Sequence, residues 1–389
     1  MDWYYIKLFF FRFIILKPHH WAYGHLGYEI LLGLCMARKE NVPLLLVEDK
    51  RNVNKALTKL RSREVKILKT PLLFLDIIKL IYRSSDIVRR GTRKVVRIFR
   101  LKNDRIESTN RPYVQPNYYR RDLIKDPVNI YLPRHMEEKA RQVAAGLGID
   151  DNTKVVTLHM RERGWRTAGK NPHVEQASEH RTVNIEAYLP AIDYLFSQGY
   201  MIVRIGDATM SPIERNGLID LATNQSRNDW FELYILMRCE FLIGCDSGPP
   251  KVCELLNIPT LVVNVVNTIL NYPLRKHSTY ILKDVYDKRR GKKLSVKEMI
   301  NDQDFLTNNN DLSKYSYTDN SSSEIKEATR EMISYLEKNT HMSKSQILYK
   351  KRLIQSQLNL ELKGLKKKWG LENGFLGNGR IGKQFLLNH

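Results

Sequence analysis

Residues 241–264, FLIGCDSGPPKVCELLNIPTLVVN, place two apolar runs on either side of a short helical segment. Two strands joined by a helix pair in parallel, because the helix returns the chain to the starting edge of the sheet. The unit therefore predicts a parallel α/β sheet. It also places Asp246, Ser247 and Gly248 at the carboxyl end of a strand, where open parallel sheets bind their ligands.

The same alternation recurs in both halves of the chain. FIILKP, a polar loop, EILLGLCMARKE and VPLLLVED form one β-loop-α-β unit, and a second series opens at Lys154 with KVVTLHM, a helix and YMIVRIGD. We predict an α/β fold with two doubly wound, Rossmann-like domains. Residues 1–135 form the first and residues 136–310 the second. A polar loop and a basic helical tail follow over residues 311–389 and can pack back on the first domain.

Charge narrows the class of partner. The 389 residues include 64 Lys and Arg against 42 Asp and Glu, a formal net charge of +22. Such an excess favours nucleic acid, an anionic membrane surface or phosphorylated substrates. The four cysteines show no CxxC pattern, which is typical of reduced thiols in a cytoplasmic protein. No uncharged apolar run reaches the length of about 18 residues that a membrane-spanning helix needs.

The turn after FLIGC suggests a site for a nucleotide-linked sugar. Gly248 lets a backbone approach closely, and the first turn of the following helix offers N–H groups to a pyrophosphate. Lys251 adds a positive charge, and Asp246 accepts hydrogen bonds from sugar hydroxyls. In the alternative interpretation, Asp246 or Ser247 only caps the helix.

Two other strand ends supply further candidates. Arg161, in VVTLHMRERGW, can hold a diphosphate with two hydrogen bonds, unless it is an ordinary surface arginine. In RTVN, Arg181 is a second phosphate contact and Asn184 a helix cap. Arg204 and Asp207 end the strand in RIGDATM, where Asp207 grips a ribose or a base edge, or simply begins a turn.

The first half offers a general base and no metal site. YGHLGYE places His25 and Glu29 at the start of a helix, with Glu29 expected in its first turn, and either can deprotonate a sugar hydroxyl. A packed or capping role for His25 is the alternative. The sequence Asp302-Gln303-Asp304 is interpreted as a solvated loop. The phosphate-binding pattern GxxxxGK[ST] is absent, and we predict neither a metal nor a redox cofactor.

These motifs together resemble a known family. DSGPPKVCELLNIPTLVVN resembles the nucleotide-sugar loop of bacterial heptosyltransferases. With VVTLHMRERGW, GYMIVRIGD and GHLGYE in this order, the chain resembles bacterial glycosyltransferases of surface polysaccharide synthesis, in the heptosyl- and fucosyltransferase-like branch of the GT-B fold. Two departures stand out. Lys251-Val252-Cys253 replaces a histidine of the family pattern, and Glu29 or His25 stands in for its early aspartate.

The resemblance implies a hexosyl- or heptosyltransferase-like enzyme. It would move sugar from a nucleotide-diphospho-sugar to a glycan or lipid-linked acceptor, with inversion and without a metal, in the cytoplasm or at the cytoplasmic face of the inner membrane. A nucleotide-sugar epimerase is the alternative on the same fold. RRGTRKVVRIFR and the lysine-rich tail also raise nucleic-acid binding, but no helix-turn-helix, zinc-finger or RNP pattern accompanies them. These basic stretches suit an anionic membrane better, so nucleic acid is not predicted as a partner.

Overall fold

The computed structural model describes residues 14–18, 20, 22–71, 106–108, 127–162, 179–269, 271–360 and 376–389. Two stretches that carry the membrane prediction lie outside these residues. They are RRGTRKVVRIFR at residues 89–100 and the basic part of the tail at residues 361–375.

The first half folds around a four-stranded parallel sheet with the order β4-β2-β1-β5. Its strands are β1 (Ile14–Lys17), β2 (Leu44–Glu48), β4 (Ile67–Pro71) and β5 (Ile106–Ser108). Helix α2 (Tyr23–Lys39) connects β1 to β2 and buries Leu26, Ile30 and Leu34, which recur at helical spacing. In chain order the sheet runs third, second, first, fourth, which is the order of half a Rossmann fold.

The second half folds around a seven-stranded parallel sheet with the order β16-β12-β11-β10-β7-β8-β9. Its strands are β7 (Val155–Leu158), β8 (Met201–Arg204), β9 (Leu218–Asp220), β10 (Phe241–Gly244), β11 (Thr260–Val265), β12 (Thr279–Leu282) and β16 (Arg380–Ile381). The chain winds outward from β7 through β8 to β9, then returns and winds the other way from β10. The direction therefore reverses between β7 and β10, which is the topological switch point of the sheet.

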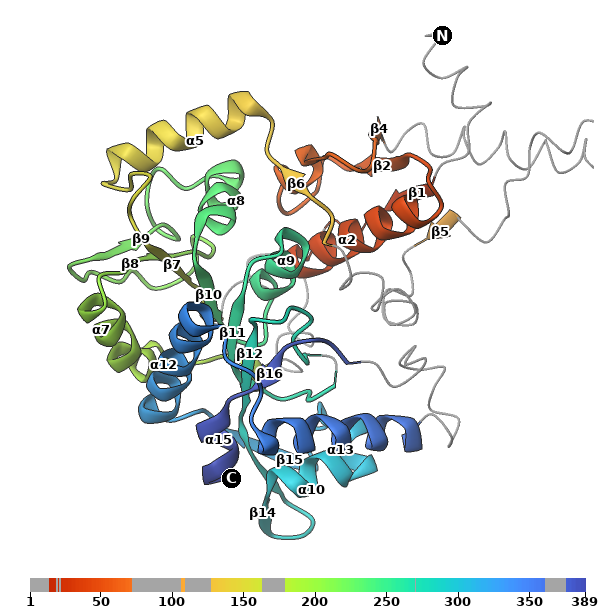
Figure 1. Cartoon of the computed structure of the whole chain (residues 1–389), viewed down its shortest axis with the longest axis vertical. Helices are drawn as coiled ribbons and strands as arrows, with labels where there is room; N and C mark the ends of the chain where they lie inside the picture. The colour runs from red at the N-terminus through yellow and green to blue at the C-terminus, as the bar shows by residue number, and fades with distance from the viewer. Residues whose placement is uncertain are drawn as a thin grey trace, which may run out of the picture.

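Helices cover both faces of the second sheet (Figure 1). Neighbouring residues of β7 point to opposite sides, so Val156 packs in the core with α7 and α12, whereas Val155 packs in the core with α8 and α9. These helices are α7 (Leu189–Ser197), α8 (Asp229–Arg238), α9 (Pro249–Leu256) and α12 (Ser322–Lys338). The predicted α/β class with doubly wound parallel sheets is confirmed, with both faces described for the second sheet and one for the first.

The remaining elements surround these two sheets. They are β3 (Arg61–Ser62), β6 (Ile130–Tyr131), α5 (Arg134–Gly146), β13 (Asp284–Asp287), β14 (Lys292–Leu294), α10 (Val296–Asn301), α11 (Gln303–Asn308), β15 (Tyr315–Thr318), α13 (Lys344–Leu360) and α15 (Lys383–Asn388). Strands β13, β14 and β15 form a small antiparallel sheet. The tail belongs to the second half where it is described, because β16 pairs with β12 and α15 packs on α12.

The two halves meet where α2 and α9 pack side by side (Figure 1). Gly24 and Gly248 touch through their backbones: a Cβ built on Gly248 would lie 2.9 Å from the nitrogen of Gly24. One turn further along, a Cβ on Gly27 would lie 2.8 Å from a methyl group of Val252. Because α2 follows β1 and α9 follows β10, this contact brings the carboxyl ends of both strands to one junction.

Candidate functional site at the carboxyl edge of the second sheet

The switch point between β7 and β10 brings predicted site residues together. His159 and Arg161 follow β7, and Asp246 and Ser247 follow β10. The Oγ of Ser247 lies 3.0 Å from Nδ1 of His159, and this contact joins the ends of the two strands. Burial, together with the charge of Arg204, lowers the pKa of His159 to about 4, so its imidazole is neutral near pH 7. The two side chains therefore form a neutral hydrogen bond.

Arg181 orients the carboxylate of Asp246. It belongs to a short 3₁₀ segment (Glu179–Arg181), donates from Nε to the main-chain oxygen of Asp246 at 2.8 Å, and places a terminal nitrogen 3.2 Å from Oδ1. The Asp246 side chain keeps 14% of its surface exposed. Asn184 accepts a hydrogen bond from the main chain of Glu186, so the predicted cap is confirmed.

His180 interacts electrostatically with this group of charged side chains. Both ring nitrogens of His180 are buried and have no hydrogen-bond partner among the described residues. Burial lowers its pKa to about 4, Asp246 opposes that change, and Arg181, Lys283 and Arg161 add to it. Three cations and one carboxylate therefore act electrostatically on the imidazole of His180. We call Arg161, His180, Arg181, Asp246 and Lys283 the switch-point cluster.

Sequence reasoning missed two members of the switch-point cluster. Lys283 directly follows β12, so the strand-end rule that singled out Arg161 applies to it equally. Its side chain is 2% exposed and is paired with Asp319. His180 follows no strand, and its position beside Arg161 and Lys283 depends on how the loop before α7 folds back.

The first turn of α9 offers fewer donors than we expected. Pro249 and Pro250 carry no N–H, and the amides of Lys251 and Val252 already donate to the oxygen of Gly248. The space beside Gly248 is taken by Gly24. Lys251 itself pairs with Glu254 at 3.0 Å. A pyrophosphate held by the N–H groups of this turn therefore lacks its donors.

Arg204 and Asp207 are engaged in local contacts. The fully buried guanidinium of Arg204 pairs with Glu162, with Asp220 at 2.9 Å, and with the main-chain oxygen of Ser211 at 2.7 Å. Asp207 accepts hydrogen bonds from the main chain and the hydroxyl of Thr209. Arg204 thus holds three segments together, and Asp207 begins a turn, as its alternative interpretation stated.

The expected position of Glu29 in its helix is wrong. Helix α2 already begins at Tyr23, after Ala22 in an extended conformation, so Glu29 falls in the second turn. Its side chain is buried, at 2% exposure. The boundary lies earlier because Gly24 and Gly27 stay within the helix, where they pack against α9, and Leu26 already packs in the core. His25 does lie in the first turn, directly after the glycine that touches Gly248.

A histidine and an aspartate that the sequence did not single out meet at the carboxyl edge of the first sheet. Nδ1 of His20, after β1, lies 3.9 Å from Oδ2 of Asp49, after β2. A hydrogen bond from Arg51, opposed by burial, lowers the pKa of Asp49 to about 2 and keeps the carboxylate ionised. The oxygen of His20 accepts a hydrogen bond from Val53 at 2.7 Å, which fixes the loop.

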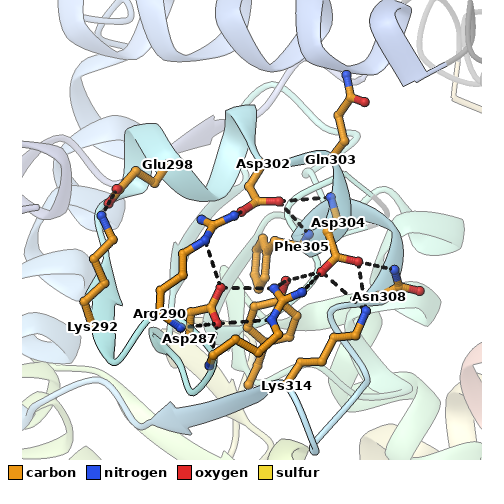
Figure 2. A network of polar contacts seen from close by, with 12 residues as sticks. Asp287, Arg290, Lys292, Glu298, Asp302, Gln303, Asp304, Phe305, Asn308 and Lys314 are labelled. Carbon is orange, nitrogen blue, oxygen red and sulfur yellow. Dashed lines mark hydrogen bonds and ion pairs between the residues drawn. The ribbon is translucent and has the colours of Figure 1, made fainter.

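The Asp-x-Asp sequence lies in an ion-pair network beside the small antiparallel sheet. Asp302 pairs with Arg290 at 2.6 Å, and Lys314 contacts Asp304 at 3.0 Å; Figure 2 shows these side chains together. Arg289 also pairs with Asp304. Although burial opposes it, hydrogen bonds from these cations hold the pKa of Asp304 well below its usual range. Both carboxylates are therefore already neutralised by protein cations.

The described part of the chain has neither a metal-binding group nor a helix that could cross a membrane. No group of three or more His, Cys, Asp or Glu side chains in it could hold a metal ion. No helix in the same residues is long and apolar enough to cross a membrane.

Comparison with known proteins gives likenesses of structure alone. No family model matches the sequence, and no curated protein matches it. Among solved structures, a glycosyl transferase family 9 protein from Veillonella parvula has a TM-score of 0.46 and 13% identity, over 83% of this chain and 97% of that one. The ADP-heptose lipopolysaccharide heptosyltransferase II of Escherichia coli has a TM-score of 0.39 and 15% identity, over 69% and 90%.

A third structure belongs to the same class. The iron-containing, dodecameric heptosyltransferase TibC has a TM-score of 0.32 and 14% identity, over 67% of this chain and 60% of its own. These proteins are of the class that the motifs around Asp246 resemble. At these identities and TM-scores, the likenesses say nothing about the substrate or the site residues of this chain.

Proposed function

We propose that this protein is a glycosyltransferase that moves sugar from a nucleotide-diphospho-sugar to a glycan or lipid-linked acceptor. One observation carries the proposal: the switch-point cluster gathers three cations, a carboxylate and an unpartnered imidazole at the position where doubly wound sheets bind nucleotides. The motifs quoted from the sequence point to the same class of donor.

The cluster suits the two ends of such a donor. Arg161 and Arg181 supply charge for a diphosphate, and buried Lys283 adds to the local field. Negative charge grows on the leaving diphosphate during transfer, so fixed cations at this place lower the barrier and take the role that a divalent ion plays elsewhere. Asp246, held by Arg181, can accept hydrogen bonds from sugar hydroxyls.

Inversion by direct attack requires a base for the acceptor hydroxyl. Glu29 and His25 remain our candidates from the sequence, and His20 joins them because Asp49 lies beside its ring. His25 directly follows Gly24, which touches Gly248 at the junction of the two halves, whereas Glu29 is buried. Loss of the base should reduce turnover by about 10²–10⁴-fold and leave donor binding intact. Comparing Glu29→Gln, His25→Ala and His20→Ala identifies it.

A thermal-shift screen tests the donor. The protein is heated with UDP, GDP, ADP, CMP and the corresponding nucleotide-sugars. A ligand at about 100 times its Kd stabilises the folded state by roughly 2.7 kcal/mol. Arg161→Ala and Arg181→Ala should each weaken binding by about 1.5–3 kcal/mol, the usual contribution of a charge-assisted hydrogen bond.

The control for the screen is Arg141→Ala, since Arg141 is an arginine on α5 that is 60% exposed and is not a member of the switch-point cluster. It should bind nucleotide as the wild type does. No stabilisation by any nucleotide would overturn the proposal. Nucleotide release that depends on an added acceptor indicates transfer, whereas conversion of the nucleotide-sugar without any acceptor indicates the epimerase.

The finer features of this function are part of the same proposal. They are hexosyl or heptosyl transfer, inversion, independence of metal, action in the cytoplasm, and attachment to an anionic membrane surface through basic stretches outside the described residues. Flotation with neutral and with anionic liposomes checks the attachment, and equal behaviour with both would refute it.

A further inference from the structure

A cavity that shares no lining residue with the switch-point cluster has a wall to which both halves of the chain contribute. Its volume is about 390 Å³, within the roughly 300–1,000 Å³ typical of small-molecule sites. It opens between β4, the beginning of α5 and the first turn of α8. The lining side chains that matter here are Lys59, Arg61, Lys69, His135, Lys139 and Trp230. We call this cavity the basic pocket.

The basic pocket is strongly cationic. Four of its side chains carry a permanent positive charge, and none of the described residues that line it is acidic. Glu48, just outside the lining, lies 3.0 Å from Lys59 and 3.9 Å from Lys69. One carboxylate cannot neutralise four cations, so the pocket keeps an excess of positive charge. Mutual repulsion of this kind disfavours an empty pocket and favours an anionic ligand.

Lys69 shows this excess most directly. It lies on β4 with 30% of its side chain exposed. Burial lowers the pKa of Lys69, Glu48 opposes the change, and Lys59 and Arg61 add to it. A bound anion would oppose this lowering of the pKa of Lys69.

Two further features complete the site. No side chain caps α5, and its first turn carries His135, which lines the pocket, and Glu137, which offsets part of the positive charge at this end of the helix. Trp230, in the first turn of α8, supplies an apolar ring to the wall. Asp229 next to it accepts a hydrogen bond from the main chain of Lys55 at 2.7 Å, which joins α8 to the segment after β2.

We propose that the basic pocket binds a phosphorylated sugar, with the phosphate among Lys59, Lys69 and Lys139 and the sugar ring on Trp230. Cations at several positions suit a phosphate, and an aromatic face suits the apolar side of a pyranose. In its role, the inference rests on the proposed function: the bound group would be part of the acceptor. Binding of the phosphate itself does not depend on that function.

Lysine footprinting tests the inference at the level of single residues. The full chain is treated with an amine-acylating reagent, with and without glucose 6-phosphate, and modification is read by mass spectrometry. We expect glucose 6-phosphate to slow modification of Lys59 and Lys139, and glucose alone to leave it unchanged. Lys297 and Lys344, exposed on α10 and α13, are internal controls that should react equally in all samples.

Substitutions distinguish the contribution of the pocket cations to binding from that of the Trp230 ring. Removal of two cations in Lys59→Gln/Lys139→Gln should weaken glucose 6-phosphate binding by tenfold or more in calorimetry, whereas Lys297→Gln/Lys344→Gln, with the same change of charge, should not. Trp230→Ala should weaken glucose 6-phosphate more than inorganic phosphate. Equal weakening of both would remove the sugar from the inference, and an unchanged footprint with glucose 6-phosphate would overturn it.

Two more outcomes distinguish failure of this inference from failure of the proposed function. Protection of the pocket lysines by phosphatidic acid vesicles, but not by glucose 6-phosphate, would refute the phosphorylated sugar in favour of a membrane surface. Protection by glucose 6-phosphate in a protein that no nucleotide stabilises would support the pocket while the proposed transfer fails.

Discussion

Alanine at Gly248 is a direct test of how the two halves of the chain meet. Its new Cβ would lie 2.9 Å from the nitrogen of Gly24, 3.4 Å from Cβ of Tyr23 and 3.5 Å from Cα of Gly24. Comfortable contacts between carbon atoms lie near 3.5–4.0 Å, so α2 and α9 would have to separate. Overpacking of this kind costs about 1–3 kcal/mol. We therefore expect Gly248→Ala to lower the free energy of unfolding by that amount.

Guanidinium chloride unfolding measures this effect, with Gly146→Ala as the matched control. A Cβ on Gly146, at the end of α5, meets nothing within 4 Å. The same exchange should therefore be neutral or stabilise by about 0.4–1 kcal/mol, because alanine restricts the unfolded chain. If Gly248→Ala were as stable as Gly146→Ala, the close packing of α2 on α9 would be refuted. Loss of nucleotide binding without loss of stability would instead indicate that Gly248 faces a ligand.

Two other substitutions test buried and exposed charge. Arg204→Met should cost about 3–5 kcal/mol in denaturant unfolding, since it leaves Glu162 and the nearly buried Asp220 without their cation, and a loss below about 1 kcal/mol would contradict a structural role. Asp304→Asn should lower the free energy of unfolding by no more than about 1 kcal/mol, because Asp304 and its partners Arg289 and Lys314 are partly exposed. This loss should become smaller at high salt, which screens exposed charges. A loss that is the same at low and high salt would contradict an ion-pair network.

The sequence could predict which residues of the candidate site follow the ends of strands. Alternation of apolar strands and amphipathic helices fixes where each parallel strand stops, and parallel strands stop at one edge. Arg161 and Asp246 were proposed in this way, and the strands before them, β7 and β10, are neighbours in the sheet. The same rule named Arg204, but it cannot tell that Glu162 and Asp220 enclose this guanidinium.

Contacts between segments that are far apart in the chain could not be predicted from the sequence. His20 and Asp49 are brought together by neighbouring strands and by the main-chain bond of Val53, neither of which leaves a local pattern. Gly248 was correctly read as a place of close backbone approach. Its neighbour is Gly24 of the first half, and only the packing of α2 on α9 reveals that. Local patterns give the chemistry of a position, whereas tertiary packing decides what meets it.

Glu232 lies buried near this junction, in the first turn of α8. Burial raises its pKa to about 7; Arg227 and Tyr23 oppose the change, and Asp229 and Asp207 add to it. The usual value for this side chain is 4.5. The folded protein thus holds a proton that the unfolded chain releases between about pH 4.5 and 7.

This difference predicts how stability depends on pH. The contribution of Glu232 to the free energy of unfolding is fully present below about pH 4.5, the pKa in the unfolded chain. It is lost as the pH rises through about 7, the pKa in the folded protein. The shift is equivalent to roughly 3 kcal/mol, at about 1.4 kcal/mol per pKa unit. Glu232→Gln cannot ionise, so it should be more stable than the wild type by up to about 3 kcal/mol near pH 8, and equal to it near pH 4. Denaturant unfolding at both pH values measures this, with Glu138→Gln on the exposed face of α5 as control. A stability difference between Glu232→Gln and wild type that stays the same at both pH values would show that Glu232 is ionised in the folded protein, and hence that water or a cation reaches the junction.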